Sequence, residues 1–387
     1  MKFTKLSLIA VLAVTTAMAG DAKISGDAKL FYSTSDVGDN DLFSRGTAGE
    51  SIGDASVEIK YSRKLKEGIT VNAGLTGVST LGLESELVSG TWVNHNGGLK
   101  DQAYIDTANI VAKVANTTLV VGRQALDTPF FYSETWNIVP NTFDAFVAVN
   151  NDIQDTTLVG AWVGRGDGDP LTVKAVNGNG GFSSFGGHPA YAFGLINKSI
   201  PNTAVQAWYY QIPSTAKAYW LQVDTSITKE ISGGIQYANA KANSESDNSQ
   251  AAAVKVGYAA GPVTAHIAYS KRSSVGSIDI ANIATGGGES KLYTEAFWNY
   301  GLVGSRKAQT IAVGTNYDLG TANLGAIYTS VDTDTLNSDV KEVALTATTK
   351  IGPVDTTFAF INTDAKGTNA GRDGNTVQAY LTVPFSL

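Results

Sequence analysis

Residues 122–145 read GRQALDTPFFYSETWNIVPNTFDA and join two segments with strand-like sequences, residues 117–124 and 142–149. Pro129 and Pro140 lie between these segments, and proline is not accommodated inside a central sheet strand. The same connection carries four aromatic residues: Phe130, Phe131, Tyr132 and Trp136. A solvent-exposed loop rarely carries so much apolar area, whereas a loop folded back into a wide barrel buries it and presents its charges to the lumen. We therefore expect residues 125–141 to form a constriction inside a barrel.

The first 19 residues predict a secretory signal peptide, which leaves residues 20–387 as one domain. Two lysines precede an apolar run over residues 6–16, and Ala17-Met18-Ala19 has the small-residue pattern of a cleavage site. The apolar run is too short to cross a bilayer as a helix. Removing Lys2 and Lys5 changes the formal net charge from −7 to −9, because −7 minus 2 is −9.

The composition favours a β-rich chain without disulfides. Cysteine is absent, which excludes a disulfide framework and thiolate metal sites. Charged residues make up 16% of the chain, against about 25% in typical soluble domains. After residue 20 no apolar stretch approaches the roughly 20 residues of a membrane helix, so any crossing of a membrane has to use strands.

Two-residue alternation recurs along the chain and predicts an antiparallel all-β fold. Val57, Ile59 and Tyr61 share one face, for example, while the residues between them are polar. The alternation gives about 18 strands, with 16 as the alternative, and residues 290–301 are treated as loop. The predicted strands are residues 22–34, 53–64, 69–80, 104–115, 117–124, 142–150, 155–164, 190–199, 202–212, 217–228, 231–242, 249–260, 262–272, 308–318, 321–331, 339–350, 353–363 and 374–384.

Connection lengths and tyrosine positions distinguish a membrane barrel from a soluble sandwich. Short turns follow the even-numbered strands, and most long connections follow odd-numbered ones, as in outer-membrane barrels. With a periplasmic N-terminus, tyrosines on the apolar face gather near both membrane interfaces, where amphipathic rings are favoured. These tyrosines are Tyr61, Tyr258 and Tyr317 at the periplasmic end and Tyr237, Tyr269 and Tyr328 at the external end.

Three stretches resemble a known porin family. GRQALDTP at residues 122–129 and VPNTFDA at residues 139–145 resemble the OprD-like outer-membrane porins. KLYTEAFWNYG at residues 291–301 is more similar to the campylobacterial-type major outer membrane porin branch. The resemblance implies an 18-stranded barrel with an inward-folded third external loop and passive diffusion of small solutes. The campylobacterial branch further implies a homotrimer and a calcium ion near the constriction.

Charged residues in and around the loop are the candidate constriction site. Opposed charges across a narrow pore select small polar or charged solutes. The candidates are Arg123, Asp127, Glu134, Asp144 and Arg165. The alternative for Arg123 and Asp127 is an ion pair that anchors the loop. Glu58, Lys60, Asp224 and Lys255 also have lumen-facing parity, and the negative net charge favours cations at the mouth.

Metal binding rests on less specific features. Asp167 and Asp169 lie in the sequence GRGDGD at residues 164–169, and carboxylates are ligands that calcium accepts. A solvated turn is the alternative reading of that segment. Asp127 and Asp144 complete the set of candidate ligands, and no cofactor is required by the leading interpretation.

The sequence predicts an outer-membrane porin and no enzyme. A Ser-His-Asp constellation, a phosphate-binding loop and a basic nucleic-acid patch are all absent from the sequence. The expected partners are outer-membrane lipid and lipopolysaccharide, small solutes and ions, and two further copies in a homotrimer, with no nucleic acid. Two alternatives stay open. One is a substrate-specific channel with a saturable site at the constriction. The other is a surface adhesin or structural barrel, whose long loops at residues 165–189 and 273–307 contact hosts or phage.

Overall fold

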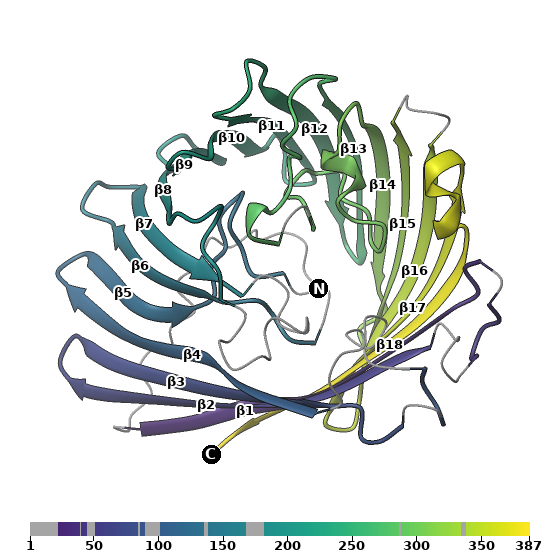
Figure 1. Cartoon of the computed structure of the whole chain (residues 1–387), viewed down its shortest axis with the longest axis horizontal. Coiled ribbons are helices and arrows are strands. Elements are labelled where there is room, and N and C mark those ends of the chain that lie inside the picture. The colour runs from purple at the N-terminus through teal and green to yellow at the C-terminus, as the bar shows by residue number, and fades with distance from the viewer. Residues whose placement is uncertain are drawn as a thin grey trace.

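The fold is a single closed sheet of eighteen antiparallel strands (Figure 1). The computed structural model describes residues 22–38, 40–44, 51–83, 86–89, 101–134, 138–167, 182–285, 288–333 and 338–387. The strands are β1 (Ala22–Ser35), β2 (Ile52–Lys66), β3 (Ile69–Ser79), β4 (Asp101–Val114), β5 (Thr117–Gln124), β6 (Phe143–Asn150), β7 (Thr156–Gly166), β8 (Ala190–Asn197), β9 (Thr203–Ile212), β10 (Ala216–Ser226), β11 (Ile231–Ala242), β12 (Ser249–Ala260), β13 (Val263–Arg272), β14 (Gln309–Asp318), β15 (Ala322–Asp332), β16 (Val340–Ile351), β17 (Val354–Ala365) and β18 (Gly374–Ser386). Short 3-10 helices lie between strands: η3 (Ile283–Thr285), η4 (Leu302–Gly304) and η5 (Gly367–Arg372).

Each strand pairs with its neighbours in sequence, and β1 closes the barrel by pairing with β18. The closing register runs from Ser25 opposite Ser386 to Ser35 opposite Thr376. Closure leaves no strand edge unpaired, which is what a sheet needs in an environment without water.

The prediction of eighteen strands is confirmed, and the alternative of sixteen is wrong. Every predicted strand overlaps an observed one, and residues 290–301 contain no strand. The predicted signal peptide lies in residues 1–21, outside the described part of the chain. Among the described residues, no helix is both long and apolar enough to cross a bilayer.

The outer face of the barrel is apolar along the strands. Ile59, Ile235 and Val256 are each about half exposed, as expected for side chains that point away from the sheet with no protein against them. The six tyrosines predicted to face lipid all lie on this face, with exposed fractions between 37% for Tyr61 and 48% for Tyr258. The predicted orientation of the alternating faces is therefore confirmed.

The inner face changes character around the barrel. Along β1 to β4 it is polar and charged, with buried Asp54, Glu58 and Asp106. Along β6 to β12 it is aromatic and small, and its large side chains include Trp208, Tyr210 and Trp220. Apolar side chains on the inner wall have to be packed against other parts of the protein, because the lumen of a barrel of this width is otherwise filled with water. Two loops supply that cover.

A charge on the outer face should destabilise the barrel, and the same charge on the inner face should not. We expect Val313→Arg, in the middle of β14, to lower the free energy of unfolding by about 2–4 kcal/mol in lipid vesicles. Asn316→Arg on the inner face of the same strand is the matched control and should change it by less than about 0.5 kcal/mol. Urea titration in vesicles measures both, and equal losses would contradict the assignment of faces.

Candidate functional site

The first inward loop, residues 125–142, folds into the barrel as predicted. Its described part forms a tight turn in which Asp127 and Tyr132 pair as a β-bridge and the Thr128 hydroxyl donates to the Phe131 carbonyl over 2.8 Å. The Phe130 ring meets the Tyr210 ring edge-on, with 5.4 Å between centroids. Phe130 and Phe131 are almost completely buried against the inner wall. The aromatic content of the loop is therefore explained by burial, and Trp136 lies outside the described residues.

This loop also reaches the opposite wall. Ile138 and Val139 pack with Phe31 of β1 and Val78 of β3. The Lys29 ammonium donates to the Ile138 carbonyl over 3.2 Å. Because β1 pairs with β2 and β18, and β10 pairs with β9 and β11, these two strands lie on opposite sides of the closed sheet. The described parts of the loop therefore contact opposite walls of the lumen.

A second inward loop, residues 273–308, was not predicted. We expected residues 273–307 to be an external surface loop, and the structure shows that this was wrong for the described part. Ile280, Leu292 and Val303 are buried, and the loop lies inside the ring of strands (Figure 1). The signal in the sequence was the same as for the first loop, because residues 291–301 contain four aromatic side chains.

Two buried side chains bind the backbone of the second loop, one at its start and one further along. At its start, Arg272 is fully buried and donates to the carbonyls of Ser273, Val275, Gly276 and Ile278 over 2.6–3.0 Å.

Further along, Glu342 of β16 accepts hydrogen bonds from the backbone N–H groups of Phe297, Trp298 and Asn299 over 2.7–3.2 Å. The Asn299 side-chain amide also donates to Glu342, over 2.9 Å. A buried carboxylate with this many donors is well satisfied.

Glu134 joins the two loops. Its Oε1 accepts hydrogen bonds from Asn282 Nδ2 over 3.0 Å, from the Thr285 hydroxyl over 2.6 Å and from the Glu289 N–H over 3.1 Å. Asn282 Nδ2 also donates to the Tyr132 carbonyl over 2.8 Å. Because the Glu134 side chain is buried in this contact, it serves to hold the loops together and does not line the open lumen, in contrast to our prediction.

Asp127 forms an ion pair with a partner that the sequence did not indicate. Its Oδ1 lies 2.9 Å from Lys291 Nζ of the second loop, and both side chains are about one-third exposed. The Lys291 ammonium also sits 4.1 Å from the centroid of the Tyr132 ring. The two inward loops thus present one acidic and one basic group side by side.

Arg123, Asp144 and Arg165 lie on the outer face, so their predicted place at the constriction is wrong. Asp144 Oδ1 is 2.9 Å from Arg123 Nε, and its Oδ2 is 2.7 Å from Arg165 Nε. The three residues are cross-strand neighbours on β5, β6 and β7. Asp144 shares its face with Phe146, which is 40% exposed. The Phe182 ring covers Arg123 at 3.7 Å.

One backbone irregularity explains the error for Arg165, and a second lies beside Arg123. The extra residue in β7 opposite Asp144 and Ala145 shifts the register, which puts Arg165 beside Asp144 on the outer face. Gly122 has a φ of 119°, and a Cβ there would collide with the Ala108 carbonyl oxygen. β5 therefore needs glycine at this position, and it continues past Gly122 to pair Arg123 with Asp144 and Gln124 with Phe143.

The inner wall carries further ion pairs below the loops. They join Lys29 to Asp27 at 3.1 Å, Lys60 to Glu58 at 2.7 Å and Lys255 to Asp224 at 3.7 Å. The predicted lumen-facing orientation of Glu58, Lys60, Asp224 and Lys255 is therefore confirmed.

Tyr293 connects the second loop to the last of these pairs. Its hydroxyl donates to Asp224 Oδ1 over 2.7 Å, and its ring lies 4.0 Å from the Lys255 ammonium. Gly234 leaves room for this ring, because a Cβ at residue 234 would lie 2.5 Å from the Tyr293 hydroxyl.

The candidate metal ligands that the structure describes do not converge. Asp127 pairs with Lys291, and Asp144 lies between two arginines on the outer face. Asp167 is buried and accepts from the Thr142 N–H over 2.7 Å, and burial raises the pKa of this carboxyl to about 7. Within the described ranges, no group of three or more His, Asp or Glu side chains is placed to hold a metal ion. Asp169 lies outside those ranges, and calcium binding stays a prediction.

Comparisons with known proteins show the same fold. OccK9 (OpdG) of Pseudomonas aeruginosa superposes with a TM-score of 0.77 at 14% identity, covering 95% of this chain and 99% of that one. OccAB1 of Acinetobacter baumannii gives a TM-score of 0.76 at 15% identity, covering 98% and 100%. The outer membrane protein OpdK of P. aeruginosa gives 0.75 at 12% identity, covering 95% and 99%. No protein-family model and no curated protein matches the sequence.

Because Glu134 joins the two loops, we expect loss of its carboxylate to loosen both of them. Glu134→Ala removes the acceptor that the two loops share. Asn282 Nδ2 and the Thr285 hydroxyl keep second acceptors, the carbonyls of Tyr132 and Asn282, but the Glu289 N–H loses the acceptor described above, which costs about 1–3 kcal/mol. We expect faster amide hydrogen exchange over residues 282–289 in this variant. Glu230→Ala, in an exposed turn between β10 and β11, is the control and should leave that segment unchanged. Unaltered exchange in Glu134→Ala would show that the contact does not hold the loops.

Two buried carboxyls make the second loop sensitive to pH. Burial raises the pKa of Glu289 to about 7, aided by the negative charge of Glu134 and opposed by Lys291. Burial also raises the pKa of Glu295 to about 8, against the stabilising N–H of Ser290. Both pKa values lie above the ordinary 4.5. The stability they contribute is therefore fully present below about pH 4.5 and is lost as pH rises through 7 to 8.

We expect the packing of residues 288–301 to weaken between about pH 4.5 and pH 8. Amide exchange, corrected for its intrinsic pH dependence, measures this change. Glu295→Gln keeps the group neutral and should reduce the change, whereas Glu67→Gln in the turn between β2 and β3 should not. Equal pH dependence in the wild type and in Glu295→Gln would contradict the role of Glu295.

Proposed function

We propose that this protein is an outer-membrane porin through which small hydrophilic solutes and ions diffuse passively. One observation carries the proposal: a closed eighteen-stranded barrel with an apolar outer face holds two loops inside its lumen, and both loops present charges there. The apolar outer face is suited to lipid, and the charged inner face is suited to water and ions. The likeness in fold to outer-membrane channels of P. aeruginosa supports the same function and location.

The orientation and selectivity follow from the same features. The short turns lie at one end of the barrel and suit the periplasmic side, as does the N-terminus. We propose weak cation selectivity, because the chain has a net negative charge and because the acidic side chains of Glu58 and Asp106 lie on the inner face. The resemblance to OprD-like porins, and to the campylobacterial-type branch among them, further supports a homotrimer as the assembled form.

A substrate-specific channel is the second candidate. Lys291 over Tyr132 and Lys255 over Tyr293 each place an ammonium group against an aromatic face at the lumen, beside an acidic group. Such mixed sites bind small organic ions more strongly than a plain aqueous channel does. Conductance that saturates with one solute would favour this candidate over general diffusion.

Single-channel recording tests the porin proposal. Purified protein in a planar bilayer with a salt gradient should insert in steps of three conducting units and give a cation-leaning reversal potential. A sealed bilayer despite demonstrated insertion would overturn the porin function and would favour the structural or adhesive alternative.

Two charge variants test whether Asp127 and Lys291 border the permeation path. Asp127→Asn leaves the lysine uncompensated and should shift the reversal potential toward anions, whereas Lys291→Met leaves the aspartate and should shift it toward cations. Glu230→Gln, outside the lumen, is the control. The absence of opposite shifts would exclude this pair from the path.

A further inference from the structure

We propose that the outer face of β8 to β11, near the end with the long loops, is a specific binding site for lipopolysaccharide. The phosphate of the lipid would lie at Lys217 and Lys241, and one acyl chain would fill the groove below them. This inference needs the barrel to sit in an outer membrane, but it does not depend on the barrel conducting.

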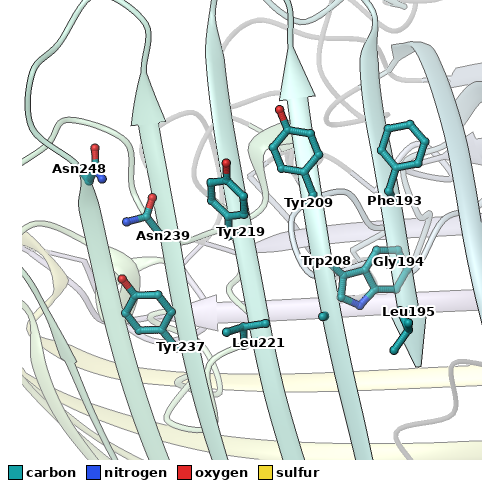
Figure 2. Close-up of a pocket in the computed structure, with 11 residues that line it drawn as sticks. Phe193, Gly194, Leu195, Trp208, Tyr209, Tyr219, Leu221, Tyr237, Asn239 and Asn248 are labelled. Carbon is teal, nitrogen blue, oxygen red and sulfur yellow. The ribbon is translucent and has the colours of Figure 1, made fainter. Parts of the chain in front are cut away.

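The groove lies on the lipid-facing surface of the barrel. It has a volume of about 650 Å³, and five aromatic side chains line it (Figure 2). Phe193, Tyr209 and Tyr219 stand side by side on β8, β9 and β10, and Tyr237 lies one row lower, opposite Leu221. Trp208 is the fifth aromatic residue of the lining. The exposed fractions of Phe193 and Tyr219 are 55% and 46%, so in the isolated chain nothing covers them.

Strand register explains the shape of the groove. Ala207 of β9 lies opposite Leu195 of β8 on one side and opposite Leu221 of β10 on the other. A small side chain between two leucines leaves a notch in the apolar surface. One row nearer the long loops, Phe193, Tyr209 and Tyr219 are cross-strand neighbours and flank the notch with rings. A flexible hydrocarbon chain fits a notch with these walls.

The row nearest the rim is polar and basic. Lys217 of β10 lies directly opposite Lys241 of β11, and opposite Gln211 of β9 on its other side. The Tyr209 hydroxyl donates to Gln211 Oε1 over 3.0 Å, so the tyrosine ring bridges the apolar and polar rows. Neither lysine forms an ion pair with any residue that the structure describes.

Two like charges in facing positions destabilise a sheet unless an anion lies between them. The nearest acidic side chains in sequence are Glu245 and Asp247, in the turn between β11 and β12. Glu245 is directed to the second inward loop, because its carboxylate accepts the Ser277 N–H over 3.0 Å. A phosphate above the aromatic row would supply the missing negative charge for both lysines.

Two features identify the lipid. One is the basic row above the aromatic row, and the other is the outward-facing end of the barrel at which both rows lie. A phosphate at the rim and an acyl chain below it describe a membrane lipid that stands upright against the barrel. The end with the long loops faces outward in outer-membrane barrels, and the lipid of that leaflet is lipopolysaccharide. A second copy of this chain is the competing occupant, since an apolar groove also suits a subunit contact.

Native mass spectrometry of protein extracted in mild detergent tests the proposal. The wild type should retain lipopolysaccharide, and Lys217→Ala/Lys241→Ala should retain about tenfold less, as expected for the loss of charge-assisted hydrogen bonds. Ala207→Trp fills the notch and should also reduce retention. Lys271→Ala/Lys341→Ala removes two exposed outward lysines of the same rim, away from the groove, and should retain as much as the wild type.

The outcomes separate this site from the alternatives. The site would be overturned if all variants retained the same amount of lipopolysaccharide. It would also be overturned if phosphatidylglycerol replaced the bound lipopolysaccharide equally well. Loss of oligomers in Ala207→Trp without loss of lipid would assign the groove to a second copy. Conductance should persist in every variant, so failure of the lipid site and failure of the porin function remain distinguishable.

Discussion

The structure depends on satisfying every backbone hydrogen bond without help from water. Pairing of β1 with β18 removes the last free edges and makes the outer face available to lipid. Once the sheet is closed, alternate side chains must point to lipid and to the lumen, and the composition of the strands follows from this division. The barrel is wide enough that its lumen cannot be filled by the side chains of the wall alone.

The two inward loops fill part of the lumen, and they are held there differently from the elements of a soluble protein core. Their aromatic side chains cover the apolar part of the inner wall, while buried carboxylates hold their backbones. Glu342 binds consecutive N–H groups of the second loop, and Glu134 joins the two loops to each other. Irregular backbone at membrane depth is tolerated here because it lies against protein and lines a lumen. The side chains of Asp127 and Lys291 are not buried in these contacts, and each stays about one-third exposed.

The outer face also carries charged residues, in addition to the apolar side chains that face lipid. Near the rim with the long loops it combines the Arg123–Asp144–Arg165 ladder with the paired lysines above the aromatic groove. Charges at this level meet the polar part of a membrane, where long basic side chains and tyrosines are both favoured. Two faces of one sheet therefore serve two environments, and the same few strands contribute to both.

Strand number, order and facing could be predicted from the sequence, because alternation and turn length are local properties. The inward course of residues 125–141 was also predictable, since Phe130 and Phe131 had to be buried somewhere. The partners of Glu134 and Asp127 were not, because they come from a loop about 150 residues away and meet only inside the closed barrel. The position of Arg165 depended on one extra residue in β7. This residue moves the Arg165 side chain to the other face of the sheet, and the hydrophobic pattern of the sequence does not indicate it. The sequence by itself thus determined the barrel and its two environments, and only the tertiary structure decided which charges meet in the lumen.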